Sequence, residues 1–371
     1  MSNPNLVRKP AIDSGGVGEI STNQVGSYSS NYKNYWINGN FDVWQRGTSF
    51  TLSGSGQVYA ADRWVIAATN TGAGSITRST SVPNIGSSYS LLYTVTTADT
   101  SVAATDYQLI GQRIEGLVFK ELYGKTFTVS FWVKGSTTGT YTFQAVNGAG
   151  TRSYITSFDI LSTNTWEFKT ITINHDITGV WNLDNQIGMQ CFISVMTGTA
   201  WQGTPNVWQN GNIFGVPTQV NMMATVGNYI QISQMMLNLG SAASPFQTFN
   251  PGYIGELAVC QRYYEKITIQ PNSYPAQYTT VGNIFFGTVL PFLVEKRANP
   301  TMSYTHDGNA FYWVIVSFQS FSANDSSGCL FDTNTKTWRL YQPRLVGAVT
   351  PTAGNLYILE ATFSIYANSE L

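Results

Sequence analysis

The strongest constraint on the fold is an alternation of apolar and polar residues that recurs along the chain. From Phe127 to Val133 every second residue is apolar, which places one set of side chains on a single face of a β-strand. Tyr141, Phe143 and Ala145 repeat the pattern after a Gly-Ser-Thr-Thr-Gly turn, so residues 126–146 are predicted to form a hairpin. Further strands are predicted at 35–45, 62–68, 89–96, 107–115, 188–196 and 228–239.

A phase change interrupts the alternation between residues 166 and 173. Trp166 and Phe168 follow one phase, and Ile171 and Ile173 follow the other, which predicts a β-bulge near 169–170. Short strands separated by Gly, Ser, Thr and Asn turns are typical of a sandwich or jelly roll. The predicted fold class is therefore all-β.

One segment departs from the β pattern. Ile254, Leu257, Ala258, Gln261 and Tyr264 recur at spacings of three and four after Asn-Pro-Gly, which predicts a helix over 254–266. Strand patterns then return at 282–294, 310–319, 327–333, 336–341 and 356–366, with a turn at 332–336. We therefore expect a jelly-roll domain at 35–250 and a smaller β domain, led by the helix, at 251–371.

The first 34 residues carry few apolar side chains. Only Ile12, Val17, Ile20 and Val25 could be buried, among many Gly, Ser and Asn residues. Alone, such a segment cannot bury enough surface to fold. Residues 1–34 are expected to be an extended arm that a partner orders, or else a flexible leader.

The composition excludes several classes of partner. Charged residues make up 11% of the chain, and 19 basic and 20 acidic residues give a net charge of -1, so a nucleic-acid surface is not expected. No apolar run is long enough to cross a bilayer, and the N-terminus lacks the apolar stretch of a secretory signal. Cys191, Cys260 and Cys329 are far apart and odd in number, so neither a disulfide framework nor a zinc site is expected.

Catalytic motifs are weak. His175 and His306 are the only histidines, each is followed by Asp in an expected turn, and no G-x-S-x-G accompanies them. Glycoside hydrolysis needs two carboxylates across a cleft. The candidates in one stretch are Asp159, Glu167, Asp176 and Asp184, which are read as isolated acids at strand ends. No catalytic residue is assigned.

The aromatic residues are more informative, because flat rings beside amide or guanidinium donors suit sugars. Trp201 and Trp208 lie in a long loop of amides and glycines. A second group combines rings with arginines near the end of the chain and comprises Tyr312, Trp313, Trp338, Arg339, Tyr341 and Arg344. Both groups are candidate glycan-binding residues. The alternative is that the rings pack against their own sheets.

Three stretches together resemble a family. The first is 38–64, with Asn-Gly-Asn-Phe-Asp-Val-Trp-Gln-Arg and Ala-Asp-Arg-Trp. The second is the 127–135 strand together with the loop from Trp208. The third is 230–264, with Gln-Ile-Ser-Gln-Met-Met-Leu-Asn-Leu-Gly and Gly-Glu-Leu-Ala-Val-Cys-Gln-Arg-Tyr-Tyr. This succession resembles tail-fibre and receptor-binding proteins of tailed bacteriophages and prophages. Their large domain resembles the galactose-binding-like jelly roll of carbohydrate-binding modules.

The resemblance implies a homotrimeric virion protein, made in the host cytoplasm, whose residues 1–34 dock on a tail or baseplate protein. It also implies a possible structural calcium ion at Asp42 and no other cofactor. We therefore expect a non-catalytic receptor-binding protein that attaches to host polysaccharide or lipopolysaccharide, with the C-terminal domain as its distal tip. The alternatives are a tail-associated polysaccharide depolymerase and a purely structural tail or baseplate component.

Overall fold

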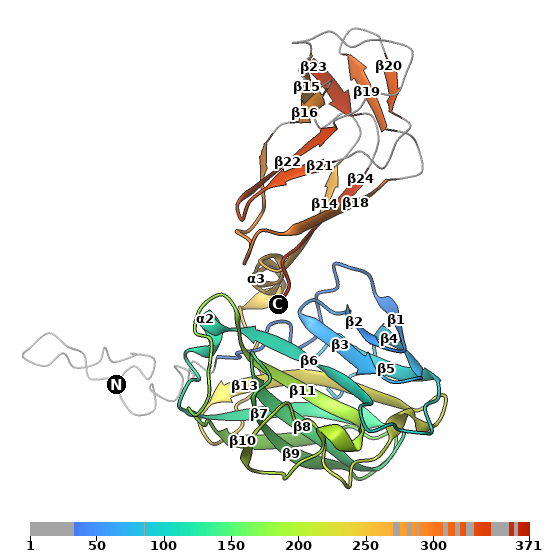
Figure 1. Ribbon diagram of the computed structural model, residues 1–371, viewed down its shortest axis with the longest axis vertical. Coiled ribbons are helices and arrows are strands. Elements are labelled where there is room, and N and C mark those ends of the chain that lie inside the picture. Colours follow the sequence, from blue (N-terminus) through green and yellow to red (C-terminus); the bar gives the residue numbers. More distant parts are fainter. Residues whose placement is uncertain are drawn as a thin grey trace, which may run out of the picture.

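The computed structural model describes residues 33–84, 86–269, 275–279, 284–287, 289–306, 311–315, 320–323, 330–342, 356–359 and 363–371. Two large sheets form a sandwich, and helix α3 (Gly252–Gln261) leads from it into a smaller group of strands (Figure 1). We call α3 and the strands after it the C-terminal unit. The fold is thus the predicted all-β jelly-roll sandwich with a helix-led β region after it. Within the described ranges, no helix is long and apolar enough to cross a membrane.

One layer of the sandwich is a six-stranded antiparallel sheet. Its strands, in spatial order, are β1 (Ser49–Ser53), β4 (Ala73–Ser79), β5 (Ser90–Thr97), β13 (Tyr229–Leu239), β7 (Thr126–Gly135) and β10 (Glu167–Asn174).

The other layer is a seven-stranded antiparallel sheet. Its strands, in spatial order, are β12 (Trp208–Asn210), β9 (Arg152–Ile160), β8 (Gly139–Asn147), β11 (Ile187–Thr197), β6 (Tyr107–Glu115), β3 (Trp64–Thr69) and β2 (Gly56–Tyr59). Short helices lie in its connections: α2 (Gly116–Phe119), η1 (Thr199–Trp201) and η2 (Met222–Ala224). The inward-facing residues of both sheets form one large core.

The predicted hairpin at 126–146 is wrong, although both of its strands exist. β7 pairs with β13 and β10 in one sheet, whereas β8 pairs with β9 and β11 in the other. The turn between them therefore crosses from sheet to sheet. Phe131 and Tyr141 both belong to the common core, which they reach from opposite sides. Alternation shows which face is buried but not which neighbour a strand pairs with.

The predicted bulge near 169–170 is also absent. β10 pairs with β7 without a register shift from Glu167–Val133 to Asn174–Thr126. Ile171 and Ile173 are buried, while Phe168 faces outward. The change of phase therefore reflects a ring on the outer face, not an extra residue in the strand.

Residues 35–45, predicted as a strand, form turns instead. Asn38 and Phe41 adopt positive φ values of 57°. The Asn38 carboxamide accepts the Val43 N–H (3.0 Å) and donates to the Val43 and Asp62 carbonyl oxygens. This side chain takes the place of a strand partner, which explains an apolar segment without β pairing.

The helix is shorter than predicted and buries a different face. α3 ends at Gln261, and Tyr264 begins β14 (Tyr264–Ile269). Ile254 is exposed, whereas Glu256 and Cys260 are buried. Glu256 accepts the backbone N–H groups of Asn38 and Asn250, so a carboxylate replaces the expected apolar contact.

The C-terminal unit contains two further sheets. One has the order β14, β24 (Phe363–Asn368) and β18 (Thr301–His306). The other contains β17 (Leu290–Pro291), β22 (Thr337–Gln342), β16 (Ile284–Gly287), β15 (Pro275–Thr279), β23 (Leu356–Leu359), β19 (Phe311–Ile315) and β20 (Ser320–Ala323), with β21 (Leu330–Thr333) beside β22. The predicted turn at 332–336 connects β21 and β22, and Asn334 Oδ1 accepts the Lys336 and Thr337 N–H groups.

Residues 1–32, most of the predicted arm, lie outside the described residues. The last two arm positions belong to the sandwich. Lys33 forms an ion pair with Glu121 (2.7 Å). Asn34 is buried and donates to the carbonyl oxygens of Met235 and Gln247, each at 2.9 Å.

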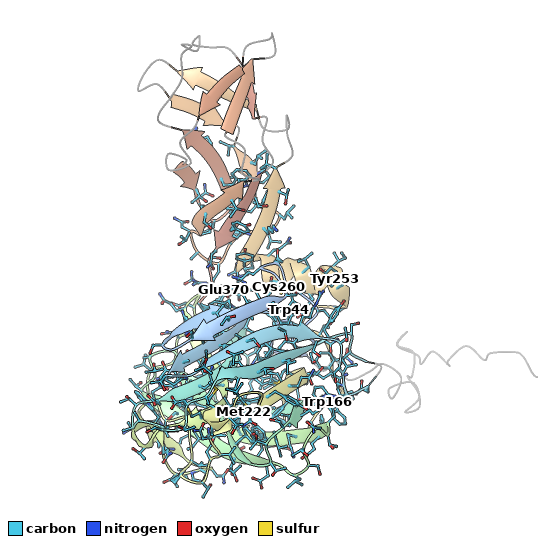
Figure 2. All side chains as sticks on the ribbon, turned by 90° about the vertical axis from the view of Figure 1, so that its right-hand side faces the viewer. Trp44, Trp166, Met222, Tyr253, Cys260 and Glu370 are labelled. Carbon is cyan, nitrogen blue, oxygen red and sulfur yellow. The ribbon has the colours of Figure 1, made fainter. Side chains whose placement is uncertain are left out.

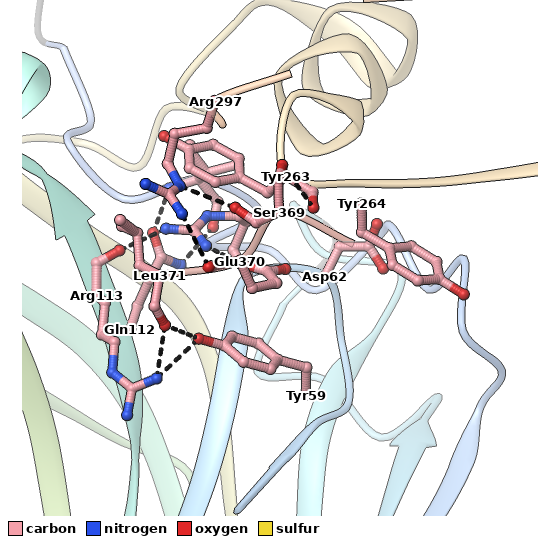
Figure 3. Close-up of polar contacts among 12 residues, drawn as sticks. Tyr59, Asp62, Gln112, Arg113, Tyr263, Tyr264, Arg297, Ser369, Glu370 and Leu371 are labelled. Carbon is pink, nitrogen blue, oxygen red and sulfur yellow. Dashed lines mark hydrogen bonds and ion pairs between the residues drawn. The ribbon is translucent and has the colours of Figure 1, made fainter. Parts of the chain in front are cut away.

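The C-terminal unit meets the sandwich at a junction of buried charges (Figure 3). The Arg63 and Glu370 side chains, 1% and 5% exposed, form an ion pair. The Arg63 guanidinium also lies 3.6 Å from the centre of the Tyr263 ring. Arg46 pairs with the same Glu370 (3.1 Å) and stacks on Tyr264. Figure 2 places Glu370 and Cys260 where the C-terminal strands meet the sandwich.

A second buried pair lies inside the C-terminal unit. The Lys296 ammonium and the Glu265 carboxylate are in contact, with side-chain exposures of 0% and 1%. Another pair, Lys336–Glu295, is 3.9 Å apart with exposures of 70% and 56%. Burial is thus the main difference between these two lysine–glutamate pairs.

We predict that Lys296→Met lowers the free energy of unfolding by about 3–5 kcal/mol, because it leaves a buried carboxylate without its counter-charge. The matched variant Lys336→Met should cost less than about 1 kcal/mol. Urea unfolding followed by tryptophan fluorescence measures both. Equal effects of the two variants would contradict this reading.

Candidate functional site

A groove of about 330 Å³ lies on the outer face of the seven-stranded sheet. β3, β6 and β11 form its floor, and the loop after β11 forms its wall. It is lined by Ala67, Thr69, Thr105, Tyr107, Leu109, Arg113, Gln190, Phe192, Trp201, Asn212 and Phe214.

Successive residues of β6 point to opposite faces of the seven-stranded sheet, and β6 carries apolar residues on both faces. Ile110 and Ile114 belong to the main core, whereas Leu109 belongs to a second apolar cluster with Val65, Phe192 and Phe214. The outer face of a sandwich is usually polar. An aromatic and aliphatic layer on this face is therefore the feature that distinguishes the groove.

Trp201 forms the aromatic wall of the groove. Its ring stacks on Phe214 with centroids 5.2 Å apart and an interplanar angle of 22°. Tyr107 meets it edge-on at 6.2 Å. The indole Nε1 donates to the Thr105 carbonyl oxygen (2.9 Å), which fixes the orientation of the ring. Trp201 is thus a partly buried ring held in a fixed orientation.

Arg113 closes one end of the groove, and its donors are occupied. Nε donates to Gln190 Oε1 (3.1 Å), and Nη2 donates to Gln57 Oε1 (2.8 Å). Nη1 donates to Tyr59 Oη (2.9 Å) and to the Leu371 carbonyl oxygen (2.7 Å). The guanidinium therefore orients neighbouring amides and hydroxyls and has little capacity left for an anion.

Arg113 is the one charged side chain in the groove lining. The next outward-facing residue of β6, Glu115, is bound by Arg262 (2.7 Å) and by the Tyr263 hydroxyl (2.5 Å). The lining thus holds no pair of carboxylates of the kind that glycoside hydrolysis requires. It can bind an uncharged, hydroxyl-rich ligand through ring faces and amides.

The four acids considered for hydrolysis each have local partners outside this lining. Asp159 accepts from Thr140 (2.8 Å), and Asp184 accepts the Gln186 N–H (2.9 Å). Glu167 pairs with Lys169 and Asp176 with Arg152. Hydrogen bonds and these cations hold the pKa values of Glu167 and Asp176 below their usual range, despite partial burial.

Trp201 and Trp208 are not brought together. Trp208 packs against the main core, on the other face of the seven-stranded sheet from Trp201. Its Nε1 donates to the Asn174 carbonyl oxygen (2.7 Å). Its ring lies beside Tyr154, His175 and Trp181, with centroid distances of 5.4 to 5.6 Å. Trp208 thus packs against the core, and a role for it in glycan binding stays a prediction.

The C-terminal candidates lie on several strands. Trp338 is 1% exposed, so its ring is covered, and Arg339 follows it on β22. Tyr312 and Trp313 lie on β19, and Tyr341 lies on β22. The contacts of these three side chains, and all of Arg344, lie outside the described part of the chain.

Calcium takes about six to eight oxygen ligands, and its binding at Asp42 stays a prediction. Asp42 accepts a hydrogen bond from Asn40 (3.1 Å). The nearby Glu256 is already bound to the N–H groups of Asn38 and Asn250. No group of three or more metal-ligating side chains occurs among the residues that the structure describes.

Most residues of the groove were not singled out from the sequence. Tyr107 and Arg113 lie on β6, Gln190 lies on β11 and Phe214 lies in the loop after it, and pairing of β6 with β11 brings the first three residues together. One signal was available: Tyr107, Leu109 and Arg113 occupy the outward phase of a strand whose inward phase is also apolar.

Comparison with known proteins gives only distant likenesses. No family model matches, and no curated protein is significantly similar. The enzymatically active domain of bacteriophage CBA120 tailspike protein 4 has 17% identity over 56% of this chain and 21% of its own, with a TM-score of 0.33. This chain therefore spans about a fifth of that protein.

Two carbohydrate-binding modules are covered almost entirely. The family 11 module of Clostridium thermocellum cellulase Lic26A-Cel5E has 10% identity over 59% of this chain and 99% of its own, with a TM-score of 0.28. TmCBM61 in complex with β-1,4-galactotriose has 12% identity over 56% and 99%, with a TM-score of 0.26. At these TM-scores the likeness carries no weight in assigning the site.

The aromatic cluster around His175 makes a prediction about pH. Burial lowers the pKa of His175 to about 4, although Asp176 opposes this shift. The unfolded chain therefore binds a proton at this histidine near pH 6.5, whereas the folded protein does so only near pH 4. As a result, the free energy of unfolding falls as the pH is lowered from 6.5 to 4.

We therefore expect the free energy of unfolding of His175→Asn to decrease less than that of the wild type between pH 6.5 and 4. Asn can still accept the Gly124 N–H that His175 Nδ1 accepts. Thermal melting at intervals of half a pH unit measures the difference. Parallel curves for the two proteins would contradict the assignment.

Proposed function

We propose that this chain is a receptor-binding protein of a tailed-phage tail fibre, and that its sandwich groove holds a bacterial surface polysaccharide without cleaving it. The observation that carries the proposal is the rigid Trp201 face beside fixed amide groups on the outer sheet. The resemblance of residues 35–266 to phage tail fibres supports the biological setting.

The groove suits a neutral sugar for a physical reason. The C–H face of a pyranose packs on an aromatic ring, while its hydroxyls exchange water for amide and hydroxyl partners. Gln190 and Asn212 supply amides at the floor and wall. Gln144 Nε2 donates to Asn212 Oδ1 (3.0 Å), which fixes that side chain before a ligand arrives. Preorganisation of this kind reduces the entropy cost of binding.

We expect Trp201→Ala to weaken binding of host polysaccharide by about tenfold or more, because the ring provides the main apolar contact. Trp208→Phe is the matched control, since Trp208 lies on the other face of the sheet. Isothermal titration with purified host polysaccharide measures both. Unchanged affinity in Trp201→Ala would show that the groove does not bind the polysaccharide.

The proposal is non-catalytic, and a depolymerase is the competing function. Incubation of the protein with host polysaccharide should release no new reducing ends and leave the polymer length unchanged. Shortening of the polymer would show that the protein is a depolymerase and not a non-catalytic adhesin. A protein that binds neither polysaccharide nor host cells would instead be a structural tail component.

We further propose that the protein is a homotrimer on the virion, attached to a tail or baseplate protein through residues 1–34. Three linked grooves would raise the apparent affinity for a repetitive polymer without any new contact. Light scattering of the purified protein should give a mass of three chains. A single-chain mass would show that trimers do not form in isolation.

A further inference from the structure

A second aromatic surface lies on the outer face of the six-stranded sheet. Trp132 on β7 is paired in register with Phe168 on β10, and their ring centroids are 5.4 Å apart. Lys134 lies two residues further along β7, with its Nζ 5.1 Å from the centre of the Trp166 ring. We call Trp132, Lys134, Trp166 and Phe168 the aromatic platform. Figure 2 labels Trp166 on the sandwich, away from the junction at Glu370.

The platform is not required by the core. The alternate residues of β7, Phe131 and Val133, are buried on the inner face and fill the space between the sheets. Phe168 is 47% exposed. Further along the same outer face lie the pairs Ser130–Thr170 and Thr128–Thr172, in which Ser130 and Thr128 are buried. The Phe168 ring therefore stays open to solvent beyond the covered part of this face.

The platform also carries a positive charge without a carboxylate partner. Lys134 Nζ donates to the Ser81 hydroxyl (2.7 Å), and burial lowers the pKa of this lysine. The nearest acid in the strand register, Glu167, is paired with Lys169 (2.6 Å). Within the described ranges, Lys134 takes part in no ion pair. This differs from the groove, where Arg113 already donates four hydrogen bonds.

We propose that the aromatic platform is a second glycan-binding site, and that it binds a carboxylate-bearing sugar residue. The rings of Trp132 and Phe168 would contact the C–H face of the sugar, and Lys134 would pair with its carboxylate. Rings and a cation on one flat surface match a ligand that is apolar on one side and anionic at its edge. The proposal does not depend on the groove.

The probes are polygalacturonate, alginate and hyaluronan, with methyl-esterified polygalacturonate as the matched neutral polymer. Wild-type protein should bind at least one of the three acidic polymers at low salt, more weakly at 0.5 M NaCl, and the ester poorly. Lys134→Gln should weaken binding by about fivefold, and Lys134→Arg should retain it. Phe168→Ser should weaken binding by about fivefold to tenfold and, because the ring is half exposed, should fold normally.

The control for charge is Lys266→Gln, since Lys266 also lies over an aromatic ring, Tyr366, but in the C-terminal unit. Trp201→Ala should leave acidic-polymer binding unchanged, which separates the platform from the groove. Equal affinities of wild type, Lys134→Gln and Phe168→Ser would overturn the proposal, as would absence of binding to all three polymers. A native mass that falls in Phe168→Ser would also overturn it and identify the platform as a contact between copies of the chain.

Discussion

The arrangement of the whole chain depends on the buried pair of Arg63 and Glu370. Arg63 directly precedes β3 in the sandwich, and Glu370 follows the last strand of the C-terminal unit. A charge buried this deeply is costly unless a partner of opposite sign meets it. The pair therefore fixes where the C-terminal unit sits. It also brings Leu371 to Arg113, so the same contact defines one end of the groove.

The two aromatic surfaces use the sheets of the sandwich in different ways. The groove lies on the seven-stranded sheet, where a loop supplies a wall and the single cation already donates four hydrogen bonds. The platform lies on the six-stranded sheet, in which β10 is the last strand at that edge among the described residues. Each surface places rings where sandwich packing needs none. The charge environment, not the aromatic content, distinguishes the ligands that the two can take.

Sequence reasoning recovered the fold class because the period-two pattern reports burial directly. The 107–115 strand was predicted with the bounds it has in β6. The pattern failed where pairing partners decide, as in the 126–146 segment, and where a side chain replaces a strand partner, as at Asn38. Of the candidate site residues, Trp201 lies in the groove. Its neighbours could not be predicted, because a groove across three strands depends on register, and register is not visible in any one segment.

The antiparallel pairing of β14 with β24 brings the beginning and the end of the C-terminal strands to one place. Tyr264 lies opposite Asn368, next to the junction. The chain between these two residues therefore leaves the sandwich and returns to it at the same junction. The length of this part of the chain and its number of strands can change without moving the sandwich, provided that the residues at the junction are kept. Both ends of the C-terminal strands are thus anchored at the base of the unit, and the strands furthest from the junction are free to vary.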